Sequence, residues 1–149
     1  MKIAIGSDHG GKSLKDSIKL HLEARGIEVI DQGAYTTDSV DYPDYAEKVA
    51  ELVLSKEADS GIVVCGTGIG ISIAANKING ILCAHVTDVF SAEMARLHND
   101  ANMIALGERI TGPGLANKIV DAYVDAEFEG GRHARRVDKM RAIEAKNVK

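Results

Sequence analysis

Cysteine is scarce in this sequence, and the two that occur form no recognisable pattern. Cys65 and Cys83 are too few for a disulfide framework and lack the paired spacing of a zinc site. The five histidines include no His-x-x-x-His pair. With no export signal in front of them, both thiols are expected to be reduced. We therefore expect neither a disulfide nor a metal site.

Long hydrophobic runs and an excess of basic residues are also missing. No apolar run approaches the roughly 20 residues of a bilayer-spanning helix, and the N-terminus reaches Asp8 too soon for a signal peptide. The net charge is −4, which argues against a nucleic-acid surface over most of the fold. The sequence thus predicts a cytoplasmic protein with no membrane or nucleic-acid partner.

Short apolar runs rich in Ile, Val and Ala recur along the chain and lack the polar alternation of half-exposed strands. They occupy residues 2–6, 27–31, 60–65, 81–86 and 102–107. Helical spacing fills the stretches between them, as in Leu14, Ile18 and Leu22, or in Phe90, Met94 and Leu97. This alternation predicts a three-layer α/β/α, Rossmann-like sandwich around a five-stranded parallel sheet. Residues 32–43, polar and turn-forming, are expected to be a surface loop near the sheet edge.

No repeat or linker divides the chain, so residues 1–149 are expected to form a single domain. After Glu129-Gly130-Gly131 the sequence becomes basic and helix-compatible, and no strand accompanies it. We expect residues from about 130 to 149 to form a helical arm that packs on a partner subunit. The prediction is a homodimer, or a dimer of such dimers.

A glycine loop follows the third apolar run. Gly66, Gly68 and Gly70 let backbone N–H groups approach an anion at the positive end of the next helix. The spacing G-x-G-x-G differs from the dinucleotide fingerprint G-x-G-x-x-G, although Asp88 lies at about the distance that the fingerprint requires. A nucleotide-binding regulatory module therefore remains an alternative for this segment.

Cys65 stands directly in front of this loop. The helix dipole would stabilise its thiolate, which can act as a nucleophile or general base while the loop N–H groups hold an oxyanion. Taken alone, Cys65 can also be a small apolar residue at a strand end. Cys83, between Leu82 and Ala84, is expected to belong to the core.

Other polar groups are expected at the carboxyl ends of the strands, where open α/β sheets bind ligands. Asp8 and His9 follow the first run, and Arg109 follows the fifth. His98 and Asn99 close the helix after the fourth run, and we expect them at the same edge. Asp8 can instead cap a helix, and His98-Asn99 can be a polar helix exit.

Arg132 and Arg136 lie four residues apart in the basic arm. On a helix they point to one side, where they can form a phosphate clamp. A solvated charged face is the alternative. His21 and His85 are expected to be structural, one on an amphipathic helix and the other in an apolar strand.

Together these segments resemble the ribose-5-phosphate isomerase B family, which includes allose-6-phosphate and galactose-6-phosphate isomerases. The matching segments follow one order along the chain: 5–11, 41–44, 65–70, 98–102, Arg109 and the Arg132/Arg136 pair. The resemblance implies a metal-free, cofactor-free interconversion of ribose 5-phosphate and ribulose 5-phosphate through a cis-enediolate, in the pentose phosphate pathway. Allose 6-phosphate as the substrate, or the role of a galactose-6-phosphate isomerase subunit, stays open.

The resemblance also implies roles for the catalytic residues. Cys65 matches the base that moves a proton between C2 and C1, and Thr67 assists it. His98, helped by Asp8, would open the furanose ring. Relatives without the cysteine use a glutamate on the following helix, but residues 71–75 contain no acid.

The remaining residues of the resemblance would bind the substrate. The backbone of Gly66, Gly68 and Gly70 would hold the developing oxyanion together with Asn99, and Tyr42 would line the cleft. The phosphate would be bound by four basic side chains, the last two from the partner subunit: His9, Arg109, Arg132 and Arg136.

Overall fold

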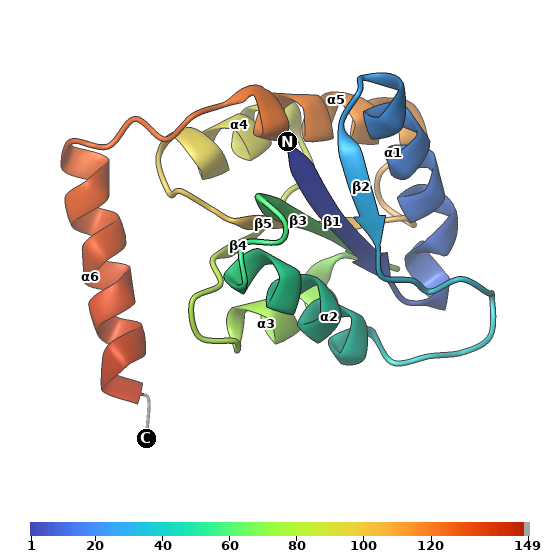
Figure 1. The fold of residues 1–149 in the computed structure, drawn as a ribbon, viewed down its shortest axis with the longest axis horizontal. Helices are drawn as coiled ribbons and strands as arrows, with labels where there is room; N and C mark the ends of the chain where they lie inside the picture. Colours follow the sequence, from blue (N-terminus) through green and yellow to red (C-terminus); the bar gives the residue numbers. More distant parts are fainter. Residues whose placement is uncertain (148–149) are drawn as a thin grey trace.

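A five-stranded parallel sheet separates two layers of helices in the computed structural model, which describes residues 1–147 (Figure 1). The strand order is β2-β1-β3-β5-β4. The strands are β1 (Lys2–Ser7), β2 (Glu28–Asp31), β3 (Ser60–Cys65), β4 (Cys83–His85) and β5 (Met103–Gly107). Residues 148 and 149, the last two of the expected arm, lie outside the described residues.

Helices cover both faces of the sheet. One face carries α1 (Lys12–Ala24), α4 (Val89–Leu97) and α5 (Pro113–Asp125), and the other carries α2 (Tyr42–Leu54) and α3 (Ile69–Asn76). Successive strand residues point to opposite faces, so Ile62 and Val64 enter the first core while Val63 and Cys65 enter the second. The predicted α/β/α sandwich is confirmed.

The fourth strand is shorter than the sequence predicts. It covers only Cys83–His85, because side chains satisfy the backbone on both sides of its start. The N–H of Leu82 donates to Oδ1 of Asn102 at 2.9 Å, and Asn76 bonds both the N–H and the carbonyl of Cys83. A strand at the edge of a sheet has one side open to such partners.

The predicted apolar stripe of α4 holds only in part, because Met94 and Leu97 are half-buried whereas Phe90 is exposed. Phe90 is 61% exposed, and the buried residues of this helix are Ala92 and Ala95. Small side chains on the inner face let α4 approach the layer beneath it closely, so the large side chain of Phe90 is left outside.

The expected loop joins β2 to α2, and a buried ion pair anchors its start. Lys15 is only 1% exposed, and its Nζ lies 2.8 and 3.0 Å from the two carboxylate oxygens of Asp31. Asp31 also accepts the N–H of Gly33 at 2.9 Å. The loop therefore leaves the sheet in a fixed direction, toward Tyr42 at the start of α2.

The C-terminal helix α6 (Arg132–Asn147) forms the expected arm and stands apart from the sandwich (Figure 1). Gly130 and Gly131, at φ 69° and 58°, turn the chain into it. His133 and Val137 form its buried side, and Oε1 of Glu144 accepts the N–H of Gly80 at 2.7 Å. The arm thus contacts the body near its start and again near its far end.

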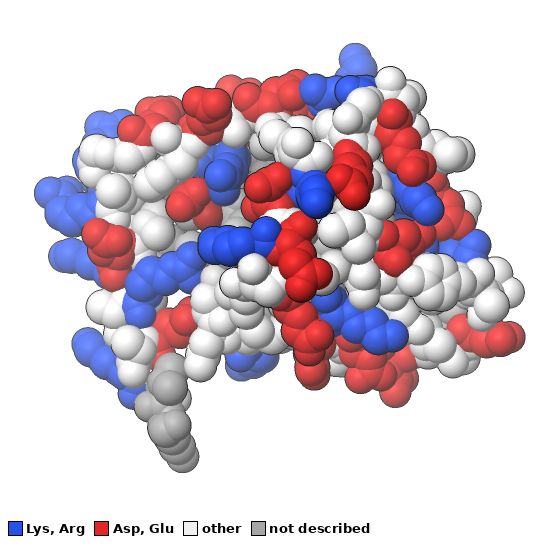
Figure 2. Space-filling view, in the orientation of Figure 1, with Lys and Arg blue, Asp and Glu red and all other residues white. Residues whose placement is uncertain are grey.

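Charge is unevenly spread on the face drawn in Figure 2. Lys and Arg gather at the left, over α6, whereas acidic side chains follow the top, over α4 and α5. Within residues 1–147, no helix combines the length and the apolar character needed to cross a bilayer.

Candidate active site

Cys65 lies at the carboxyl edge of the sheet, at the foot of α3. It is the last residue of β3, is 5% exposed, and its Sγ accepts the N–H of Gly68 at 3.1 Å. The helix begins one residue further on, at Ile69. The sulfur therefore faces a backbone donor and the positive end of a helix.

The glycine loop holds its shape because Gly68 has φ +81° and is closely covered. A Cβ on this residue would lie 2.9 Å from the ring of His85. Nε2 of His85 is 2.9 Å from the carbonyl oxygen of Thr67 and donates to it. His85, expected to be only structural, thus supports the loop that donates to Cys65. Its position at the end of an apolar run was the one signal for this in the sequence.

Tyr42 and Arg109 contact the same loop from two other parts of the fold. The ring of Tyr42 covers Gly70, where a Cβ would lie 2.7 Å from the tyrosine Cζ. The guanidinium of Arg109 lies beside Gly66, and its backbone N–H donates to the Gly66 carbonyl at 2.9 Å. The loop is therefore walled by an aromatic ring on one side and a cation on the other.

Asp8 lies next to the loop and caps the turn η1 (His9–Gly11). Its Oδ1 accepts the N–H of Gly11 at 3.1 Å, so the capping interpretation holds. A Cβ on Gly10 would contact both this oxygen, at 3.4 Å, and the backbone nitrogen of Gly66, at 3.5 Å. Asp8 is thus both a cap and a neighbour of the glycine loop.

His9 is held in one tautomer. Its Nδ1 accepts the N–H of Val40 from the loop before α2, at 3.1 Å. A nitrogen that accepts carries no proton, so the neutral ring has its hydrogen on Nε2. That hydrogen is available to an anion at the carboxyl edge.

His98 and Asn99 lie at the opposite edge, and their expected position is wrong. They follow α4, which runs back from the end of β4 to the start of β5. Met103 at that start pairs with Gly61, whereas Cys65 pairs with the last residue of β5. Four strand residues, on the order of 13 Å, therefore separate the two levels. Within one chain, neither His98 nor Asn99 joins Cys65 and Asp8.

Arg132 and Arg136 project from the first turns of the arm and are exposed. The arginine ion pairs within residues 1–147 involve Arg25 and Arg96. The described part of the chain therefore offers no acid to Arg132 or Arg136, nor to Arg109 at the other edge. All three cations remain available to an anionic ligand.

His98 has close neighbours that the sequence did not indicate. Its ring stacks on that of His133, with centroids 4.1 Å apart, and its Nε2 lies 3.5 Å from Oε1 of Glu129. Burial, together with the nearby His98 and Arg132, lowers the pKa of His133. Glu129 and His133 are four residues apart along the chain, whereas His98 is brought to them only by the fold.

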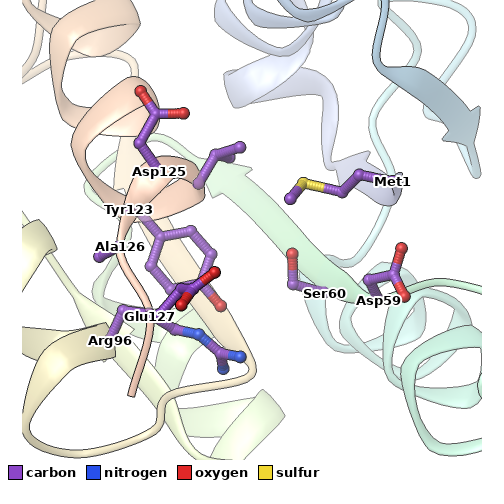
Figure 3. A pocket seen from close by; sticks show the side chains of 9 residues that line it. Met1, Asp59, Ser60, Arg96, Tyr123, Asp125, Ala126 and Glu127 are labelled. Atoms are coloured by element: carbon purple, nitrogen blue, oxygen red, sulfur yellow. The ribbon is translucent and has the colours of Figure 1, made fainter. Parts of the chain in front are cut away.

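A cavity of about 570 Å³ also opens at the amino edge (Figure 3). Arg96 and Tyr123 line one side of it, and Asp59 and Ser60 line the other. Most of these polar groups already have partners. Nη1 of Arg96 lies 2.9 Å from Oδ1 of Asp100, and Asp59 accepts the N–H of Lys2 at 2.8 Å. The cavity is therefore large, but most of its polar side chains are already paired and few remain to bind a ligand.

At the carboxyl edge of this α/β fold a thiol, a loop of backbone N–H donors and the cation of Arg109 lie together, a combination that can move a proton on a small anionic substrate. The profile of the ribose/galactose isomerase family matches residues 3–140. The chain belongs to this family.

Relatives of the chain extend over almost its whole length. It is 52% identical to a putative sugar phosphate isomerase of Bacillus subtilis, covering 99% of this chain and all of the other. It is 51% identical to ribose-5-phosphate isomerase B of Escherichia coli, over 96% of each chain. The structure of ribose-5-phosphate isomerase B from Clostridium thermocellum superposes with a TM-score of 0.98 at 59% identity, over 99% of this chain and all of that one.

Two further relatives have names that bear on the substrate. The structure of the Mycoplasma genitalium ribose-5-phosphate isomerase B contains ribulose 5-phosphate, and it matches with a TM-score of 0.92 at 42% identity, over 98% and 97% of the two chains. A D-erythrulose-4-phosphate isomerase of Pectobacterium atrosepticum is 44% identical, over 94% and 93%.

Proposed function

We propose that this protein interconverts ribose 5-phosphate and ribulose 5-phosphate. The observation that carries the proposal is the pairing of Sγ of Cys65 with the N–H of Gly68 at the foot of α3, in a family whose near relatives have this activity by name. A thiol so placed combines a base and an oxyanion hole within one turn of chain.

Cys65 is the base in this proposal. As a thiolate it removes the proton from C2 of the open-chain aldose, and the C–H electrons form a C1–C2 double bond while O1 becomes an oxyanion. The thiol then returns the proton to C1, and the O2 hydroxyl loses its proton as C2 becomes the carbonyl. That proton passes from O2 to O1, which becomes the C1 hydroxyl, and Thr67 assists this transfer. Backbone N–H groups of the loop from Gly66 to Gly70 stabilise the enediolate.

The phosphate binds at the other end of the substrate. His9 donates from Nε2, and Arg109 supplies a cation beside Gly66. This binding energy, remote from the reacting carbons, positions C1 and C2 against Cys65. The ring of Tyr42, which covers Gly70, lines the cleft between the phosphate end and the reacting carbons.

The site requires two chains. His98 and Asn99 lie beyond reach of the Cys65 of their own chain, and Arg132 and Arg136 project from an arm that leaves the body. In a homodimer with two-fold symmetry each chain gives these residues to the other, and two identical sites result. There His98, helped by the partner's Asp8, opens the furanose ring, Asn99 adds to the oxyanion hole, and the two arginines clamp the phosphate.

A coupled assay on ribose 5-phosphate, with and without EDTA, tests the proposal. Turnover is expected, and EDTA should not reduce it. Absence of turnover on any aldose phosphate would contradict the proposal. Parallel kcat/KM values on allose 6-phosphate and D-erythrulose 4-phosphate rank the six- and four-carbon alternatives, the latter prompted by the Pectobacterium relative.

A further inference from the structure

Three metal-binding side chains meet where the arm joins the body. His98 ends α4, Glu129 lies in the segment between α5 and α6, and His133 is in the first turn of α6. One ligand atom from each lies within 4.8 Å of the other two. No part of the proposed proton-transfer step uses Glu129 or His133.

Backbone hydrogen bonds hold the residues of this cluster in place. The N–H of Glu129 donates to the carbonyl of Leu97 at 3.0 Å, beside His98, and the N–H of His133 donates to the carbonyl of Gly130 at 3.1 Å. The two imidazole rings stack with an angle of 8° between them. Much of the ordering that a metal site demands is therefore already present.

We propose that His98, Glu129 and His133 form a binding site for a divalent transition metal ion of the Zn²⁺ class. Two imidazole nitrogens and a carboxylate are donors that such ions prefer. Three protein ligands leave one tetrahedral position open to water or to a substrate oxygen.

The distances leave a small adjustment. Nε2 of His98 lies 3.5 Å from one oxygen of Glu129, and Nε2 of His133 lies 4.0 Å from the other. Ligands about 2.0–2.2 Å from a tetrahedral Zn²⁺ are roughly 3.3–3.6 Å apart. The rings must tilt from their parallel stack, since each nitrogen lone pair has to point at the same ion. His98 has the freedom to do so, because its side chain is 37% exposed.

The ion would inhibit the enzyme. This consequence rests on the proposed function, in which His98 opens the sugar ring. A nitrogen bound to metal cannot exchange a proton with the ring oxygen, and the ion would also tie the start of the arm to α4. Metal binding does not depend on the isomerase activity, so the proposed metal site and the proposed function can be refuted independently.

Calorimetric titration of the full chain with Zn²⁺ at neutral pH, and absorption spectra with Co²⁺, test the site. We expect one ion per chain and cobalt bands typical of nitrogen and oxygen donors. His133→Asn and Glu129→Gln should each weaken binding at least about tenfold. His21→Asn is the matched control, because that histidine pairs with Asp121 elsewhere, and it should bind as the unsubstituted protein does.

Unchanged affinity in both His133→Asn and Glu129→Gln would overturn the proposal, as would a cobalt–thiolate charge-transfer band, which would assign the ion to a cysteine. Thermal melting gives a second measure, since an ion that binds only the folded chain raises the Tm. That rise should disappear in both variants. Loss of turnover on adding Zn²⁺, relieved by His133→Asn, supports inhibition, and full turnover with the ion bound refutes it.

Discussion

Cys65 and Tyr123 lie near opposite edges of one sheet, and their surroundings differ in kind. Around Cys65 the cation of Arg109 has no acid within residues 1–147, and the imidazole of His9 keeps a free donor. Around Tyr123 the polar groups satisfy one another: its hydroxyl donates to the Ala101 carbonyl at 2.6 Å, and Arg96 pairs with Asp100. A cavity of about 570 Å³ lies at the second edge, whereas the free hydrogen-bonding groups lie around Cys65, and it is these groups that distinguish the site.

Among the substitutions that test this comparison, Cys65→Ala should have the largest effect. Removing a general base costs about 10²- to 10⁴-fold in rate, so kcat should fall by about that much. Circular dichroism and thermal melting should show an intact fold. Cys83→Ala is the control, because burial raises the pKa of Cys83 to about 12 and keeps it a neutral core thiol. Retained turnover in Cys65→Ala would remove it as the base.

A hybrid dimer tests whether the two edges meet across a subunit interface. Chains with Cys65→Ala and chains with His98→Asn carry different affinity tags, are co-expressed, and are purified as mixed dimers. Such a dimer contains one intact site and one doubly altered site, so it should regain about half of the unsubstituted activity. Activity no higher than that of the better parent homodimer would place each site within one chain.

Truncating the arm's arginines should affect binding more than chemistry. Arg132→Ala and Arg136→Ala each remove a charged hydrogen bond to the phosphate, about 1.5–3 kcal/mol, and KM should rise about 10- to 100-fold with a smaller change in kcat. Arg135→Ala is the matched control, since Arg135 is exposed on the same helix. Steady-state kinetics decide the question, and a KM unchanged in both variants would remove the clamp.

Tyr123→Phe should have the smallest effect of these changes, and it should lower stability instead of activity. It removes the buried bond to Ala101, so the free energy of unfolding should fall by about 1 kcal/mol. Urea denaturation measures this loss. The kcat should stay unchanged, and a marked fall would show that the amino edge takes part in chemistry.

The sheet and one half of the candidate site were predictable because they depend on short stretches of chain. Continuous apolar runs are typical of buried strands. The segment from Cys65 to Gly70 leads directly from one strand into the helix that follows it. The error for Phe90 has a different origin: spacing identifies an apolar stripe, but the helix could approach the sheet only with the small Ala92 and Ala95 inside.

The position of His98 followed from topology and was missed. A helix that connects two parallel strands begins at the carboxyl edge and must end at the amino edge, so His98 at the end of α4 belongs there. Its pairing with His133 is not predictable in this way. It depends on the turn at Gly130 and Gly131, whose angles place the arm against α4.

Gly130 and Gly131 are also the point about which the arm α6 would rotate relative to the body. Its sixteen residues span about 24 Å, so a rotation of about 10° at the pivot would move the far tip by about 4 Å. Arg136 lies only about 6 Å along the axis and would move by about 1 Å. Bending at this joint is therefore absorbed mainly at the tip, near the bond from Gly80 to Glu144. The proposed phosphate clamp would therefore lie where such a rotation displaces the arm least.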